Sequence, residues 1–238
     1  MVFMQSDLLF LNSSINKLDD KWRSILLKQY DVLSYIDHQL INLTKNNLNI
    51  LPPANLIFKA LEYTKFDDIK VLILGQDPYH KLNLSNGLAF MVNDNCAKPS
   101  SLINIYKELL TEYSSDMSYK QLPNDLLKSW ALNGVLLLNT SLTVIEGMAN
   151  SLSKIGWHTI TDYIIKFISD NLTNIVFILW GQFAINKTHL INPNKHLVLK
   201  AAHPSGLSAR RGFFGCNHFI LANEYLLKHN KSTRDTIV

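Results

Sequence analysis

The chain has 238 residues, of which 47% are hydrophobic and 18% charged, and 23 basic against 19 acidic residues give a net charge of +4. This apolar fraction excludes a disordered chain, and the 9 glycines and 7 prolines exclude a fibrous one. Two cysteines, Cys96 and Cys216, are too few for a disulfide-stapled secreted scaffold and lack a zinc-binding spacing, so we expect buried thiols in a reducing compartment.

The first expected element is an N-terminal helical stretch, about residues 1–50 with its centre at 19–43, that packs on the rest of the chain. After it, amphipathic segments alternate with short apolar runs. The amphipathic segments predict helices over 54–63, 101–113, 125–132, 157–170 and 217–229. The apolar runs predict strands over 71–74, 134–138, 175–179 and 196–199.

This alternation predicts a single α/β domain over 1–238, with a central four-stranded, mostly parallel sheet flanked by helices on both faces. The N-terminus lacks the basic region and cleavage site of a signal peptide. The longest uncharged run, 129–145, contains several polar residues, which favours a buried strand over a membrane span. We therefore expect a soluble intracellular protein that does not contact membranes.

Polar residues follow each predicted strand where it ends. Asp77 lies in the segment after the first strand, Asn139 follows the second, Gly181 follows the third, and His203 follows the fourth. The carboxyl ends of parallel strands meet at one edge of a sheet, which is where open α/β folds bind ligands. The pattern predicts a reaction site at this edge.

Each of these residues also has an ordinary structural explanation. Asp77 in a Gly-x-Asp-Pro turn can bond its own backbone, and Asn139 can cap the segment that follows it. His203 can be a hydrogen-bonded loop histidine, and Phe90 can belong to the core. Their arrangement at one edge favours the functional interpretation for all four together.

An acid, an imidazole, an amide and an aromatic ring suit the recognition and excision of a planar base. The H-x-E…P-C-x-x-C pattern of zinc deaminases is absent from the sequence, as are the GxxxxGK[ST] and GxGxxG phosphate loops. We expect no metal and no cofactor.

The segments 75–80 (GQDPYH) and 203–219 (HPSGLSARRGFFGCNHF) resemble the water-activating motif and the DNA-intercalating loop of family 1 uracil-DNA glycosylases. The resemblance runs in order from about residue 50 to about residue 226. Further matching segments are 52–53, 87–90, 101–109, 136–140 and 156–157. Several long motifs in the right order identify the chain as a member of this family.

The resemblance implies a role for each matching residue. Asp77 would position water and support an oxocarbenium-like sugar, and His203 would be a neutral imidazole that bonds the O2 atom of the uracil base. The residues of the base pocket would be Gln76, Tyr79, Phe90 and Asn139. The residues that contact DNA would be His80, Pro99, Ser100, Ser101, Gly181, Gln182, Ser205, Leu207, Ser208 and Arg211.

In this scheme Asn139 reads the uracil edge, Phe90 stacks on the ring and Tyr79 excludes the 5-methyl group of thymine. Leu207 inserts into the duplex, while hydroxyl groups and backbone amides hold the phosphates. The implied partners are single- and double-stranded DNA containing uracil, and an inhibitor protein of the phage type. We expect a monomer in the bacterial cytoplasm, or in the nucleus if the source is viral or eukaryotic.

Three positions and one segment depart from the usual family pattern. Gln182 replaces a phosphate-binding serine, Gly206 replaces a proline, Leu152 replaces a histidine, and residues 81–86 replace a segment with Gln-Ala. These departures affect the expected DNA affinity more than the chemistry, and Gly206 should loosen its loop. Two other functions stay open: a non-catalytic DNA-binding or polymerase-accessory subunit, and mismatch-directed removal of thymine.

Overall fold

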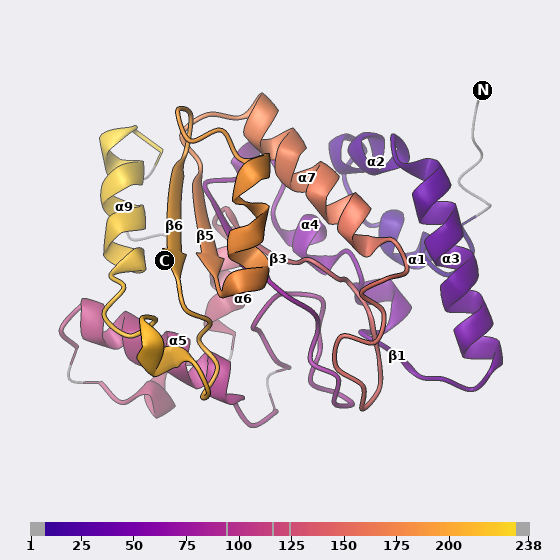
Figure 1. The fold of residues 1–238 in the computed structure, drawn as a ribbon, viewed down its shortest axis with the longest axis horizontal. Coiled ribbons are helices and arrows are strands. Elements are labelled where there is room, and N and C mark those ends of the chain that lie inside the picture. The colour runs from indigo at the N-terminus through magenta and orange to yellow at the C-terminus, as the bar shows by residue number, and fades with distance from the viewer. Residues whose placement is uncertain (1–7, 94, 116, 124, 232–238) are drawn as a thin grey trace.

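The computed structural model describes residues 8–93, 95–115, 117–123 and 125–231. At its centre lies a four-stranded sheet with the strand order β3-β2-β5-β6 (Figure 1). All pairings within this sheet are parallel, whereas the sequence predicted a mostly parallel sheet. Its strands are β2 (Val71–Gly75), β3 (Val135–Asn139), β5 (Val176–Trp180) and β6 (Leu197–Ala201). The first three are buried along their whole length, as their continuous apolar sequence predicts.

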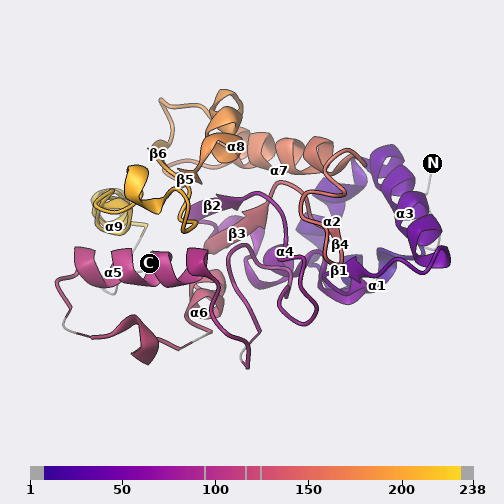
Figure 2. The ribbon, with the colours of Figure 1, turned by 60° about the horizontal axis from the view of Figure 1, so that its bottom comes forward.

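Helices cover both faces of the sheet, as predicted. In Figure 2, α7 (Trp157–Asn171) and α8 (Gln182–Ile185) lie above the sheet, while α5 (Ser100–Glu112) and α6 (Leu126–Leu132) lie below it. Two apolar cores correspond to these faces, and α9 (His218–Lys228) contributes to the same core as α5.

The predicted N-terminal helical stretch consists of three helices: α1 (Asn12–Ile15), α2 (Asp20–Leu27) and α3 (Tyr30–Lys45). The Asp19 side chain accepts a hydrogen bond of 2.8 Å from the Trp22 backbone amide and so caps α2. Apolar side chains of all three helices share one core with the sheet and α7. Residues 1–7 and 232–238, the two ends of the predicted domain, lie outside the described residues.

Short elements account for most differences from the prediction. The segment expected to be one helix over 54–63 divides into the 3-10 turn η2 (Ala54–Leu56) and α4 (Lys59–Tyr63). A second sheet pairs β1 (Ile50–Leu51) with β4 (Val144–Ile145), and two-residue strands leave no periodic pattern to detect. The remaining 3-10 elements are η3 (Phe66–Asp68), η4 (Tyr119–Gln121), η5 (Asn186–Leu190) and η6 (Ala209–Arg211).

The described part of the chain contains no helix of the length and apolar character that a membrane span requires. Neither cysteine forms a disulfide, and each is half-buried, whereas the sequence predicted buried thiols. Cys96 donates to the Asn83 carbonyl oxygen at 3.3 Å.

Candidate active site

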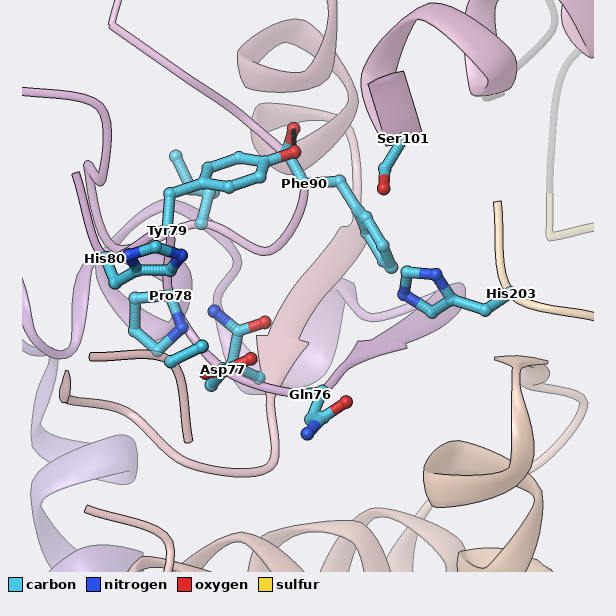
Figure 3. A pocket seen from close by; sticks show the side chains of 11 residues that line it. Gln76, Asp77, Pro78, Tyr79, His80, Phe90, Ser101 and His203 are labelled. Atoms are coloured by element: carbon cyan, nitrogen blue, oxygen red, sulfur yellow. Dashed lines mark hydrogen bonds between the residues drawn. The ribbon is translucent and has the colours of Figure 1, made fainter. Parts of the chain in front are cut away.

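A cavity of about 150 Å³ lies at the carboxyl ends of β2 and β3, at the predicted edge of the sheet. Figure 3 shows the rings of Phe90 and His203 side by side, with Asp77 and Tyr79 across the cavity from them. The lining residues are Gln76, Asp77, Pro78, Tyr79, His80, Leu88, Phe90, Ser101, Asn139, Ala149 and His203. The fold therefore brings together both predicted catalytic residues and all four predicted pocket residues.

Asp77 lies two residues beyond β2, in the turn that carries the strand into the cavity. Its Oδ2 atom accepts a hydrogen bond of 2.7 Å from the Asn150 backbone amide. Burial raises the pKa of Asp77 above its ordinary value, while the Asn150 bond and the nearby His80 and His203 rings oppose that shift. One carboxylate oxygen is thus anchored, which fixes the direction of the other.

Asn139 is the last residue of β3 and is paired in register with Gly75 of β2. A Cβ atom on Gly75 would lie 2.2 Å from Oδ1 of Asn139, so only glycine leaves room for this amide. Beyond the strands, the Ser141 backbone amide and the Thr140 hydroxyl both donate to the Gln76 carbonyl oxygen, at 2.9 and 2.7 Å. Asn139 is 6% exposed and is held on a rigid element.

Phe90 adopts a left-handed backbone conformation, with φ of +65°, which is costly for a bulky residue. The Tyr79 hydroxyl donates to the Phe90 carbonyl oxygen at 3.2 Å, and burial raises the pKa of Tyr79, so the phenol keeps its proton. The Phe90 ring centroid lies 5.8 Å from that of His203. This unusual backbone places the ring in the wall of the cavity.

His203 follows β6, and its backbone passes close to Gly181, whose φ is +86° and where a Cβ atom would lie 2.8 Å from the His203 Cβ. The Ser205 backbone amide donates to Nδ1 of His203 at 3.1 Å, so the proton of the neutral ring lies on Nε2. Burial lowers the pKa of His203, and the Asp77 carboxylate partly opposes this. His203 is therefore suited to donate a hydrogen bond as a neutral imidazole.

The loop that carries His203 is held by three side-chain contacts. The Asn104 side-chain amide donates to the Pro204 carbonyl oxygen at 2.8 Å, and the Ser208 hydroxyl donates to the His203 carbonyl oxygen at 2.8 Å. The hydroxyls of Ser205 and Ser208 lie 2.8 Å apart. The tip residue, Leu207, is 90% exposed, which is unusual for a large apolar side chain.

The sequence is similar to a known protein family over most of its length. Residues 61–227 match the model of the uracil DNA glycosylase superfamily. The chain belongs to this superfamily. The uracil-DNA glycosylase of Borreliella burgdorferi is 47% identical over 222 residues, covering 91% of this chain and 96% of the relative. The uracil-DNA glycosylase of Salmonella agona is 44% identical over 216 residues, covering 90% of this chain and 93% of the relative.

Solved structures of the superfamily share the fold. The crystal structure of mimivirus uracil-DNA glycosylase superposes with a TM-score of 0.82 at 26% identity, covering 91% of this chain and 86% of the mimivirus chain. A mimivirus UNG variant in complex with UGI gives a TM-score of 0.84 at 25% identity, covering 91% and 88%.

Four of the predicted DNA-contact residues line one of two neighbouring cavities. His80 and Ser101 line the cavity itself, while Gly181 and Gln182 line a smaller cavity of about 80 Å³ that shares Gln76 and His203. The other predicted contacts, which do not line either cavity, are Pro99, Ser100, Ser205, Leu207, Ser208 and Arg211.

Two departures from the superfamily pattern receive a structural explanation. Gln182 donates from Nε2 to Oδ1 of Asn186 at 2.6 Å, so its side chain lies along α8. Leu152 is 3% exposed and belongs to the apolar core on the α7 face, where a histidine would lose that packing. Leu152 therefore has a core role in this chain.

Pro78, Leu88 and Ala149 line the cavity although their residue types predict no role there, and the hydrogen bond from Asn150 to Asp77 has no counterpart in the sequence pattern. A backbone amide 73 positions away leaves no signal in residue types.

Among the described residues, one group could supply three metal ligands: Glu108, Glu112 and Cys216. Its carboxylates already accept hydrogen bonds from backbone amides. Glu108 accepts one from the Gly215 amide at 2.9 Å, and Glu112 accepts two from amides at the start of α9, at 2.9 Å each. We interpret Glu108 and Glu112 as a clamp between α5 and the start of α9.

Proposed function

We propose that this protein excises uracil from DNA by hydrolysing the N-glycosidic bond of deoxyuridine, which leaves an abasic site for base excision repair. The single observation that carries the proposal is the meeting of Asp77, Asn139, Phe90 and His203 in one cavity. Membership of the uracil DNA glycosylase superfamily supports the same conclusion.

Base recognition follows from the residue types in the cavity. The Asn139 amide offers one donor and one acceptor, which complement a uracil carbonyl and ring N–H. Cytosine presents an amino donor at the corresponding carbonyl position and is thereby disfavoured. Phe90 offers a stacking surface, and Tyr79 narrows the wall where the 5-methyl group of thymine would enter.

The chemistry needs a carboxylate and a neutral imidazole. The bond between the C1′ carbon and the base nitrogen breaks with its electron pair moving to the base, and Nε2–H of His203 stabilises the charge that gathers on O2. Asp77 stabilises the cationic sugar and orients a water molecule. The water oxygen forms the new bond to C1′, and its proton is finally taken up by the departing uracil.

Access to the base requires that the nucleotide leave the duplex. We assign Leu207, at the exposed tip of its loop, to the space that the nucleotide vacates. Hydroxyl groups of Ser101, Ser205 and Ser208 lie around the cavity mouth and the loop, where they can bind phosphate oxygens. Both single- and double-stranded DNA containing uracil are expected substrates.

Two alternatives are disfavoured by particular residues. A purely DNA-binding subunit has no need of a half-buried acid opposite an imidazole of lowered pKa, yet Asp77 and His203 provide both. Removal of mismatched thymine requires space for the methyl group, and Tyr79 occupies the cavity wall with its hydroxyl bonded to Phe90.

The test is release of the free base from oligonucleotides that contain uracil or a thymine mismatch, with wild type and Asp77→Asn compared. We expect wild type to release uracil only. Asp77→Asn should be slower by roughly 100- to 10,000-fold, with uracil-DNA binding retained. Wild type that binds DNA without releasing a base would contradict the proposal, as would a fully active Asp77→Asn.

The same proposal includes the setting in which the protein acts. The mimivirus relative was crystallised with UGI, and we infer that an inhibitor protein of this kind binds the cavity face of our protein as well. The relatives from Borreliella and Salmonella are bacterial, which supports action in the bacterial cytoplasm. We propose a monomer, and light scattering in solution tests this.

A further inference from the structure

Behind the cavity wall lies a buried side chain that the proposed reaction does not use. His218 is the first residue of α9 and is 4% exposed. Its Nδ1 atom accepts a hydrogen bond of 3.0 Å from Nε1 of Trp180, the last residue of β5. Because an indole N–H can only donate, this bond requires an unprotonated Nδ1. Burial lowers the pKa of His218 to about 4, so this acceptor is present at neutral pH.

The Trp180 indole connects His218 to the cavity. Its ring contacts that of Phe90 edge-on, with centroids 5.6 Å apart and an interplanar angle of 65°. The rings of Phe213 and Phe219 pack against the same indole, with centroid distances of 5.2 and 6.0 Å. Trp180 also lines the smaller cavity beside His203. The hydrogen bond to His218 adds direction to contacts that are otherwise apolar and non-directional.

The position of His218 is itself fixed from α5. Oε2 of Glu112 accepts the backbone amides of Phe219 and Ile220 at 2.9 Å each, which satisfies two amides in the first turn of α9. Glu108 accepts the backbone amide of Gly215 just before the helix. These bonds give the imidazole a rigid support.

We propose that His218 is a positioning residue for uracil binding, which holds the Trp180 indole so that this indole keeps the Phe90 ring in the stacking orientation. Phe90 needs such support because its left-handed backbone is intrinsically unfavourable, and the Tyr79 bond holds only its carbonyl group. The inference rests on the proposed excision of uracil, since it concerns the ring that contacts the base.

Two substitutions at His218 separate its hydrogen bond from its packing. His218→Leu fills similar space without an acceptor, whereas His218→Asn keeps an acceptor oxygen near the place of Nδ1. We expect His218→Leu to lower kcat/KM and to raise the inhibition constant of free uracil by about 3- to 10-fold, the size of one neutral hydrogen bond. His218→Asn should remain close to wild type.

The readouts exclude a merely structural effect. Rates are taken per folded protein and well below the unfolding temperature of each variant, so a less stable variant is not mistaken for a slower one. Affinity for undamaged duplex should not change in either variant, because no base enters the cavity. The proposal is overturned if Leu and Asn variants behave alike, or if neither differs from wild type.

A double-mutant cycle tests the path through Trp180. Trp180→Phe removes the donor, so adding His218→Leu in that background should not raise the uracil inhibition constant further; fully additive effects would overturn the proposal. If His218→Leu does not fold, Trp180→Phe alone is the test. A uracil inhibition constant unchanged in that variant would overturn the positioning role proposed for His218. Absence of uracil release by wild type would instead overturn the proposed function, which keeps the two failures distinct.

Discussion

At the scale of single residues, burial shifts the two reactive groups of the site in opposite directions. It raises the pKa of Asp77 and lowers the pKa of His203, because a low-dielectric site disfavours the charged form of each. Their mutual attraction opposes both shifts. The proposed mechanism needs an ionised acid and a neutral imidazole, so this attraction favours the required state of Asp77 and works against that of His203.

This coupling gives a prediction for the titration of His203. Asp77→Asn removes the negative charge that favours the imidazolium, so the pKa of His203 should fall further below its ordinary value than in wild type. The midpoint can be followed by NMR of the labelled imidazole. His196 makes its own bond to the Ser169 carbonyl oxygen and should titrate as in wild type. An unchanged or higher His203 midpoint would contradict the electrostatic coupling.

At the scale of elements, the loop from His203 to Ser208 combines a firm base with an exposed tip. The replacement of a usual proline by Gly206 predicts a looser loop, while hydrogen bonds from Asn104 and Ser208 hold the carbonyl groups of Pro204 and His203 at its start. A Cβ atom on Gly206 would lie 3.7 Å from the Ser100 side chain, an ordinary contact. The loop is therefore supported by its neighbours, and glycine is not required at its centre.

Leu207→Ala tests the role of the tip. An inserted Leu207 side chain fills the space that a nucleotide vacates in a base stack. We therefore expect Leu207→Ala to reduce uracil release more from duplex than from single-stranded oligonucleotides. Both substrates are measured at one salt concentration, because phosphate contacts make affinity salt-dependent. Leu132 is 59% exposed at the end of α6, before β3 begins, and Leu132→Ala serves as the matched control. Equal losses on both substrates would mean that Leu207 supports the cavity instead.

The sequence predicted the four sheet strands because each is a continuous apolar run, and it predicted the site because parallel strands end at one edge. It did not predict the pairing of β1 with β4, or the division of the N-terminal stretch between α2 and α3, since tertiary packing sets both. The sequence also did not predict the hydrogen bond from the Asn150 amide to Asp77 or the left-handed backbone of Phe90, because residue type alone does not encode backbone geometry.

The clamp between α5 and α9 predicts a pH-dependent contribution to stability. Burial, together with the nearby Glu108, raises the pKa of Glu112 from 4.5 to about 7. The folded state therefore holds a proton that the unfolded state has lost between these values, and the free energy of unfolding should fall as pH rises from about 4.5 to about 7.

Glu112→Gln isolates this contribution, because glutamine resembles the protonated acid at every pH. The stability of the variant relative to wild type should therefore increase between pH 4.5 and 7, while other groups cancel in the difference. Urea unfolding of both proteins across this range provides the measurement. A difference that does not change with pH would show that Glu112 has the same pKa folded and unfolded.

At the scale of the whole molecule, some cations in the described part of the chain are held in ion pairs and others are not. Within the described ranges, the ion pairs involve Lys21, Arg23, Lys59, Lys166 and Lys187, and none of them involves Arg210 or Arg211. These two arginines lie in η6, directly after the His203 loop, and both are exposed. Helices α2 and α3 occupy the end of the molecule opposite α5 and α9 (Figure 1).

The net charge of +4 is modest, so the position of the cations should matter more for DNA binding than their number. If Arg211 neutralises one phosphate, Arg211→Gln should weaken binding to every sequence and reduce the slope of log K against log salt concentration by about 0.9. Arg23→Gln removes the same charge from α2, where Arg23 pairs with Asp20, and should leave the slope unchanged. Fluorescence anisotropy with undamaged duplex at several salt concentrations measures both. Equal slopes for the two variants would contradict a phosphate contact by Arg211. DNA binding would then depend on the net charge of the protein and not on the position of this arginine beside the cavity.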